Sequence, residues 1–359
     1  MREEKIIQLF TPGPLGGAEK VLIRGLEFFK KRNIKTELWL IKENRVPEHC
    51  DKFLSYIDNL NISYKVIETN STFDFTTIKK IKKLIKKNNI DLIHAHGIKA
   101  SFYGKLASRG HSKFITTHHG NTSHTLKVKV YEYLEKLVMK NSDQTIAVSK
   151  PMHDDLVASG LKRVSLVENL LSFDVQTRSS PNNKILKFII VGRLSPEKGH
   201  LDLLKALTNI QYNYHLNIIG DGNCETEILN FINTNNMSKN VSLLGFSDNI
   251  KELMSCADAL LMPSHREGLP MTLIEAICIG LPVIGSNVGG LSYLVSDNGL
   301  LFTPQNINEI TEKLIEFNDQ RSTFLKVACE HSIKFQNRFH PENWVKNTVE
   351  VYKKVLSQV

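Results

Sequence analysis

The stretch from Ala259 to Gly285 reads ALLMPSHREGLPMTLIEAICIGLPVIG. An apolar run at 259–262 is followed by a polar turn, an apolar stretch of helical length and a second apolar run at 282–285. Short apolar strands joined through a helix are typical of a parallel β-sheet that is covered by helices on both faces. The stretch therefore predicts an α/β fold.

The same alternation continues on both sides of this stretch. Apolar runs predict strands at 5–10, 37–41, 63–67, 90–94, 114–117, 144–148, 188–192, 216–220, 241–244, 259–262 and 282–285. One series of strands precedes a polar stretch at 172–184, which contains Pro181, and a second series follows it. We therefore expect two Rossmann-like, doubly wound α/β domains.

This organisation predicts an N-terminal domain at 1–171, a linker at 172–184, a C-terminal domain at 185–340 and a final helix at 341–359. Pro341 suits the first turn of that helix, where no backbone N–H is needed. We expect the helix to pack back toward the N-terminal domain. Ligands of open α/β sheets bind beyond the carboxyl ends of the strands, so functional residues are sought there.

The composition is that of a soluble globular protein. The 359 residues are 41% hydrophobic and 23% charged, which excludes wholesale disorder. No apolar run reaches the ~18 residues that span a bilayer, and the charged first residues do not resemble a signal peptide. The five cysteines are widely spaced without a C-x-x-C pair, so neither disulfides nor a zinc site are expected. A cytoplasmic setting follows.

Positive charge is concentrated in the first half. Residues 1–170 contain 29 Lys and Arg against 18 Asp and Glu, whereas the remainder of the chain is close to neutral. The segment 78–87 places apolar residues on one helical face and six lysines elsewhere. An ordinary sheet-covering helix explains this pattern, but the lysines could also contact an anionic membrane surface. No nucleic-acid recognition motif accompanies the charge.

Two carboxylates mark the quoted stretch. Glu267 falls at the turn after a strand, and Glu275 follows eight residues later inside an apolar helix. A carboxylate is costly to bury without partners. Glu275 is therefore interpreted as lying on an exposed edge of a core helix, as a member of a structural ion pair, or as an acceptor of bonds from ligand hydroxyls.

Cations and glycines follow the first strand of each domain. Arg193 and Lys198 come after the strand at 188–192 and are expected to be exposed, where they would suit a diphosphate. Gly16 and Gly17 follow the first strand of the chain and open a helix. Free N–H groups at such a helix start favour an anion.

Taken together, the motifs resemble those of retaining glycosyltransferases of family 4 (group 1), which have the GT-B architecture of two Rossmann-like domains facing across a cleft. Glu267 and Glu275 match the E-x7-E signature of that family. The other matching segments are 16–19 (GGAE), 91–97 (DLIHAHG), 116–120 (TTHHG), 147–150 (AVSK), 191–199 (VGRLSPEKG), 219–222 (IGDG), 244–246 (LGF) and 288–290 (VGG). Two departures are Leu170, where the family often has Gly, and Tyr293, where it often has Glu.

The resemblance implies roles for individual residues. Glu275 would bind the ribose hydroxyls and Glu267 the donor sugar, while His119 would lie near the anomeric centre, with His118 as the alternative. The remaining implied donor-binding residues are Arg193 and Lys198 for the diphosphate, Gly268 and Leu269 beside Glu267, and Gly16 and Gly17 over the phosphates. No metal and no cofactor are expected, because no D-x-D motif occurs at a plausible position.

The implied reaction transfers a hexosyl or N-acetylhexosaminyl group from a nucleotide-sugar, with UDP as the expected nucleotide, and retains the anomeric configuration. The expected acceptor is a glycan or lipid-linked molecule of bacterial-type surface polysaccharide synthesis, used by an enzyme peripheral to the inner face of the cell membrane. A nucleotide-sugar epimerase and a non-catalytic sugar-nucleotide binding module are the alternatives.

The histidines at the end of the strand predicted at 90–94 are interpreted as structural. His94 and His96 flank Ala95 and are expected to point to opposite faces of the sheet, so that they form no simple ligand pair.

Overall fold

The computed structural model describes residues 4–14, 16–71, 74–120, 126–175 and 185–358. The chain divides into two compact units. Unit 1 comprises Met1–Ser172 and Phe339–Val359, and unit 2 comprises Phe173–Arg338. Most of the predicted linker, residues 176–184, lies outside the described residues.

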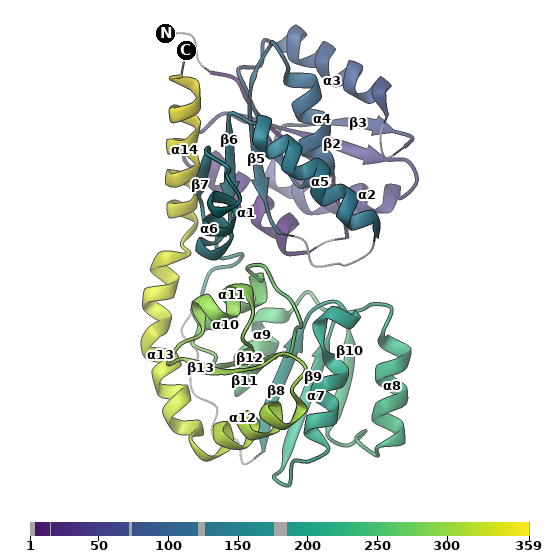
Figure 1. Cartoon of the computed structure of the whole chain (residues 1–359), viewed down its shortest axis with the longest axis vertical. Helices are drawn as coiled ribbons and strands as arrows, with labels where there is room; N and C mark the ends of the chain where they lie inside the picture. The colour runs from purple at the N-terminus through teal and green to yellow at the C-terminus, as the bar shows by residue number, and fades with distance from the viewer. Residues whose placement is uncertain (1–3, 15, 72–73, 121–125, 176–184, 359) are drawn as a thin grey trace. The chain divides into compact units, whose positions relative to one another are not determined.

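Unit 1 contains a parallel seven-stranded sheet with the order β3-β2-β1-β4-β5-β6-β7 (Figure 1). Its strands are β1 (Ile6–Phe10), β2 (Thr36–Glu43), β3 (Tyr64–Thr69), β4 (Leu92–His96), β5 (Lys113–His118), β6 (Gln144–Ala147) and β7 (Val164–Leu166). Its helices are α1 (Gly17–Lys31), α2 (Pro47–Ile57), η1 (Asp58–Leu60), α3 (Phe75–Asn88), α4 (Ile98–Ser108), α5 (Leu126–Asn141), α6 (Lys150–Ala158) and α14 (Pro341–Leu356).

Helices cover both faces of this sheet. The neighbouring helices α3, α4 and α5 pack on one face over an apolar cluster that includes Leu9, Ile93 and Phe114. On the other side, α1 contacts both α2 and α14. The ring of Phe29 on α1 lies 5.2 Å from that of Trp344 on α14, measured between centroids. The final helix is therefore an integral part of unit 1.

Unit 2 contains a parallel six-stranded sheet with the order β10-β9-β8-β11-β12-β13. Its strands are β8 (Leu186–Val191), β9 (Tyr214–Ile219), β10 (Val241–Gly245), β11 (Ala259–Met262), β12 (Val283–Ser286) and β13 (Gly299–Phe302). Its helices are η2 (Pro196–Lys198), α7 (His200–Leu207), α8 (Glu225–Thr234), α9 (Ile250–Ser255), α10 (Met271–Ile279), α11 (Gly289–Leu294), α12 (Ile307–Asp319) and α13 (Arg321–Arg338).

The layers of unit 2 follow the same plan. Helix α7 contacts α8 and α12, whereas α10 contacts α9 and α13 (Figure 1). Every residue of helix α10 except Thr272 is buried, and all of its buried residues except Glu275 are apolar. The prediction of two doubly wound α/β domains is confirmed.

In each sheet the strand order reverses beside the first strand, between β1 and β4 and between β8 and β11. Such switch points open the crevice in which α/β sheets bind ligands. The segments that carry the predicted site residues follow β1, β8 and β11, except that His119 follows β5. Among the described residues, no helix is both long and apolar enough to cross a membrane.

Candidate functional site

The loops after β8 and β11 bring a lysine and a glutamate together. The Lys198 Nζ atom lies 2.5 Å from Oε1 of Glu267, and the Ser264 hydroxyl donates to the same oxygen at 2.6 Å. The side chain of Glu267 is only 4% exposed, and that of Lys198 is 19% exposed. The expectation that Lys198 is exposed was wrong, because its ammonium group is drawn to a buried carboxylate.

A second contact ties these two loops to each other. The backbone N–H of His265 donates to the carbonyl of Glu197 at 2.8 Å, and the His265 ring meets Asp202 Oδ2 at 2.7 Å. Sequence patterns did not identify these residues or Ser264 as part of the site. Their proximity depends on the pairing of two strands that lie far apart in the sequence.

Glycines set the backbone around Glu267. Gly289 has φ +47°, and a Cβ atom there would lie 1.9 Å from the carbonyl oxygen of Glu267. The N–H of Gly290 donates to the carbonyl of Gly268 at 2.6 Å. Only residues without a side chain allow this close approach. The start of α11 therefore holds the 267–268 backbone in place.

The other residues predicted in this unit lie on the segments that follow β8 and β11. Arg193 is exposed at the end of β8. Leu269 and Glu275 are buried, at 6% and 3% exposure, and Glu275 lies on α10, the helix that the 267–270 loop enters. Tyr293, at the atypical position, accepts a hydrogen bond from Arg338, whose guanidinium lies 4.8 Å from the centre of the Tyr293 ring.

In unit 1 the predicted anion cradle already holds a carboxylate. The N–H groups of Gly13 and Gly16 donate to Oε1 and Oε2 of Glu19 at 3.2 and 3.1 Å. Burial raises the pKa of Glu19, although these backbone bonds oppose the shift. The cradle at Gly16 is therefore capped by a side chain of its own helix, which the sequence did not predict.

The histidine doublet separates into two environments. Nδ1 of His118 lies 2.8 Å from Oε1 of the buried Glu135. His119 instead lines a cavity, and its Nε2 atom is buried with no hydrogen-bond partner. Burial, with His118 as the next cause, lowers the pKa of His119 to about 4.

The prediction that His94 and His96 point to opposite faces was wrong. Their ring centroids lie 4.1 Å apart, since residues two positions apart along a strand share a face of the sheet. Burial lowers the pKa of His94 to about 3 and that of His96 well below its ordinary value. Both rings are therefore neutral at physiological pH.

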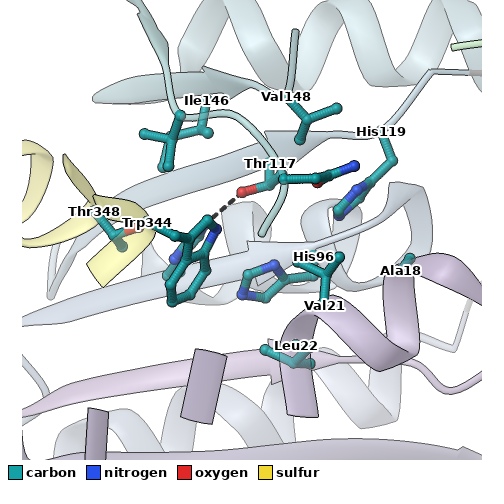
Figure 2. A pocket seen from close by; sticks show the side chains of 13 residues that line it. Ala18, Val21, Leu22, His96, Thr117, His119, Ile146, Val148, Trp344 and Thr348 are labelled. Atoms are coloured by element: carbon teal, nitrogen blue, oxygen red, sulfur yellow. Dashed lines mark hydrogen bonds between the residues drawn. The ribbon is translucent and has the colours of Figure 1, made fainter. Parts of the chain in front are cut away.

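These histidines line one cavity in unit 1. Figure 2 shows His96, Thr117 and His119 beside it, with Trp344 and Thr348 of α14 contributing another wall. Besides His119, Thr348 places a hydroxyl oxygen there that is buried without a hydrogen-bond partner among the described residues. Within the part of the chain that the structure describes, no group of three or more His, Cys, Asp or Glu is arranged to hold a metal ion.

Known families match both halves of the chain. Residues 15–172 match the family described as Glycosyltransferase Family 4, and residues 174–330 match Glycosyl transferases group 1. An uncharacterized glycosyltransferase of Methanocaldococcus jannaschii is 32% identical over 76% of this chain and 78% of the relative. The chain belongs to the group 1 glycosyltransferases.

Two further comparisons bear on this group 1 glycosyltransferase. The UDP-Gal:alpha-D-GlcNAc-diphosphoundecaprenol alpha-1,3-galactosyltransferase of Escherichia coli is 25% identical over 86% of each chain. The crystal structure of Anabaena HepE in complex with UDP covers 98% of this chain and 100% of its own, with a TM-score of 0.83 and 21% identity. The GT-B fold is thereby confirmed.

The fold of this glycosyltransferase assembles most of the predicted residues of unit 2 at one edge of the sheet. Lys198 and Glu267 are in direct contact, and Gly268 is fixed by the neighbouring glycines. The residues predicted in unit 1, namely Gly16, Gly17 and His119, all lie at or beyond the carboxyl ends of β1 and β5.

Proposed function

We propose that this glycosyltransferase transfers a sugar from a UDP-sugar with retention of the anomeric configuration. The observation that carries the proposal is the contact between Lys198 and Glu267 at the switch point of unit 2, on backbone held by glycines. A cation at the carboxyl end of a parallel sheet suits a diphosphate, and a buried carboxylate beside it suits sugar hydroxyls. The similar crystal structures of Anabaena HepE in complex with UDP and with UDP-glucose support this choice of nucleotide.

Arg193 and Lys198 act on the leaving group. Negative charge develops on the diphosphate as the glycosidic bond breaks, and positioned cations stabilise such charge in the transition state. Arg193 is exposed and can form a bidentate contact with phosphate oxygens. Lys198 supplies a second positive charge, whose position is fixed by Glu267.

Glu267 contacts the transferred sugar. Lys198 and Ser264 both donate a hydrogen bond to its Oε1 atom. We assign the other carboxylate oxygen to a hydroxyl of the donor sugar. Glu275, buried on α10 eight residues further along, binds the ribose hydroxyls.

His119 and the turn at Gly16 and Gly17 are the contributions of unit 1. A neutral imidazole fits a reaction in which positive charge develops on the sugar, because an imidazolium would repel it. The lowered pKa of His119, about 4, supports this neutral form. Gly16 and Gly17 bind donor phosphates, which requires that Glu19 give up its bond to Gly16. The reaction requires neither a metal nor a cofactor.

The acceptor is a lipid-linked glycan at an anionic membrane surface. The similar E. coli protein is named for a diphosphoundecaprenol acceptor, which supports this class. Five lysines of α3 are exposed, whereas Ile81 and Ile85 are buried in the core; the exposed ones are Lys79, Lys80, Lys83, Lys86 and Lys87. Docking is therefore electrostatic, because the apolar face of α3 is already packed against the sheet.

A screen of UDP-, GDP- and ADP-sugars by thermal stabilisation tests the donor. A ligand that binds the folded protein raises its stability, and at a given concentration the gain is larger for a lower Kd. We expect stabilisation by UDP-sugars, and transfer to a lipid-linked acceptor with an unchanged anomeric configuration in the product. Stabilisation by GDP- or ADP-sugars alone would contradict the choice of UDP. Conversion of the donor without any acceptor would support an epimerase instead.

A further inference from the structure

One face of the sheet in unit 1 carries polar side chains that are sealed from solvent. Gln8 on β1, His94 and His96 on β4, and Thr117 on β5 are 0%, 1%, 5% and 4% exposed. Burying polar groups costs free energy unless they are hydrogen-bonded. The four residues are bonded to one another and to a single residue of the final helix.

That residue is Tyr352 on α14. Its hydroxyl accepts a hydrogen bond from Nε2 of Gln8 at 2.9 Å and lies 2.7 Å from Nδ1 of His94. Among the described residues, Nδ1 of His94 is the only acceptor within reach of the hydroxyl's own proton, so the hydroxyl donates to His94. Burial raises the pKa of Tyr352, so the phenol keeps that proton.

This contact links the tautomers of both buried histidines through Gln8. With Nδ1 of His94 accepting from Tyr352, the His94 proton lies on Nε2, which is 2.6 Å from the Thr117 hydroxyl. Nε2 of His96 lies 2.9 Å from Oε1 of Gln8, which can only accept, so His96 is also protonated on Nε2. Turning the Gln8 amide over would reverse every donor in the network, so the two tautomers are linked.

Both branches of the network end beside His119. Thr117 lies two residues before His119, and both line the cavity shown in Figure 2. On the other branch, the ring centroid of His96 lies 6.4 Å from that of His119. The unpartnered Nε2 of His119 therefore belongs to a ring that lies beside residues bonded, directly or through Gln8 or His94, to Tyr352.

We propose that Tyr352 is a positioning residue for His119: its hydroxyl fixes the tautomers of His94 and His96 and thereby the orientation of the His119 ring. This inference rests on the proposed role of His119 in sugar transfer. Tyr352 belongs to the last helix of the chain, α14, and the chain returns to unit 1 only at Phe339.

The test replaces Tyr352→Phe in the full chain, which removes only the hydroxyl. Tyr103→Phe is the matched control, because Tyr103 is equally buried in unit 1, at 1% against 2%, and its hydroxyl bonds with the backbone of Ser71 and Asp74. Long-range ¹H–¹⁵N spectra of histidine-labelled protein report the tautomer of each ring. In the unaltered protein we expect His94 and His96 to be protonated on Nε2.

In Tyr352→Phe we expect the ¹⁵N signals of His94, His96 and His119 to shift, whereas Tyr103→Phe leaves them unchanged. The kcat should fall by about 10- to 100-fold, the scale of a catalytic group displaced by a fraction of an ångström to an ångström. UDP binding should stay unchanged, because Tyr352 is not among the residues assigned to UDP.

Histidine signals in Tyr352→Phe that match those of the unaltered protein would overturn the proposal, as would a kcat equal to that of Tyr103→Phe. If Tyr352→Phe does not fold, Thr117→Val removes the other end of the network at constant volume and should shift the same signals. The proposed role of His119 in sugar transfer is tested separately. If His119→Ala keeps full turnover, that role is excluded, whereas the result on the tautomers of His94 and His96 still stands.

Discussion

Lys198 holds the carboxylate of Glu267, with Nζ and Oε1 2.5 Å apart, although the two residues lie 69 positions apart in the chain. The glutamate side chain is almost fully buried, so the lysine is its charge partner as well as a ligand-binding candidate. The two proposed phosphate-binding cations, Lys198 and Arg193, therefore differ in what their loss should do to the fold.

Replacing either cation by alanine should lower turnover by about 10²–10³-fold, the scale of losing one preorganised group in the transition state. Lys198→Ala should also reduce stability by about 3 kcal/mol, because it leaves the buried Glu267 carboxylate without its charge partner. Arg193→Ala should leave stability unchanged, since Arg193 is exposed. Steady-state kinetics and thermal unfolding measure the two effects.

Turnover within tenfold of the unaltered enzyme in either variant would exclude the assigned role.

In the same assays, a chelator should leave activity largely intact. Complete loss of activity that Mn²⁺ reverses would contradict a metal-independent reaction.

The two carboxylates should respond differently to replacement by glutamine, which keeps the volume and removes the charge. Glu275→Gln should weaken binding of free UDP by about 1.5–3 kcal/mol, since a charge-assisted bond to the nucleotide is lost. Glu267→Gln should mainly lower kcat and leave UDP binding nearly unchanged, because it contacts the group that reacts. Calorimetry with UDP and steady-state kinetics provide the comparison.

The reverse pattern would exchange the two assignments. If neither replacement alters UDP binding or turnover, both carboxylates are structural, and the proposed donor site loses its main support.

Gly289→Ala should disturb the site through the backbone. Its new methyl group would lie 1.9 Å from the carbonyl oxygen of Glu267, so the 267–268 backbone must move. We expect a loss of at least about 3 kcal/mol of stability, the range of severe backbone strain, together with a lower kcat.

The matched control is Gly245→Ala. Gly245 has φ +67°, also in the left-handed region, but no atom lies within 4 Å of its added Cβ. This variant should lose only about 1 kcal/mol from the left-handed conformation. Equal effects of the two substitutions on stability and kcat would show that the contact with Glu267 is unimportant.

The fold should be sensitive to mild acid because of buried neutral histidines. Burial lowers the pKa of His200 to about 4 from its ordinary 6.5, and neither ring nitrogen has a hydrogen-bond partner. The unfolded chain takes up a proton near pH 6.5, whereas the folded chain resists until about pH 4. Neutral His200 therefore costs the folded chain no stability above pH 6.5. As the pH falls from 6.5 toward 4, protonation of His200 in the unfolded chain lowers the free energy of unfolding.

His200→Leu removes this proton uptake. The comparison uses the free energy of unfolding of the variant minus that of the unaltered protein. This difference should be about 2 kcal/mol more favourable to the variant at pH 5 than at pH 7.5. Thermal unfolding of both proteins across this range measures the change. A difference in Tm that is independent of pH would contradict the prediction.

Membrane contact through α3 should depend on salt. The chain should sediment with anionic vesicles at low ionic strength and detach as salt is added, because each lysine near an anionic surface contributes about 1 kcal/mol. Replacing Lys79, Lys83 and Lys86 by glutamine should weaken this binding without unfolding the helix, since these side chains are exposed. Equal sedimentation with neutral and anionic vesicles would exclude the surface.

Local sequence patterns determined the two-domain α/β fold. Strand and helix periods, glycine turns and the charged residues that follow strands are properties of neighbouring residues, so they can be identified without tertiary structure. Two strands were missed. Strand β7 has three half-buried residues, and β13 begins at a glycine, and both lie at sheet edges where the apolar pattern is weak.

The arrangement of side chains at the site required the tertiary structure. No local pattern placed Glu19 in the cradle beside Gly16 or separated His118 from His119. The contact between Gln8 and Tyr352 joins residues 344 positions apart. Such contacts arise only when strands from distant segments pair and the final helix packs against them, because each depends on which side chains meet across an interface that no local pattern describes.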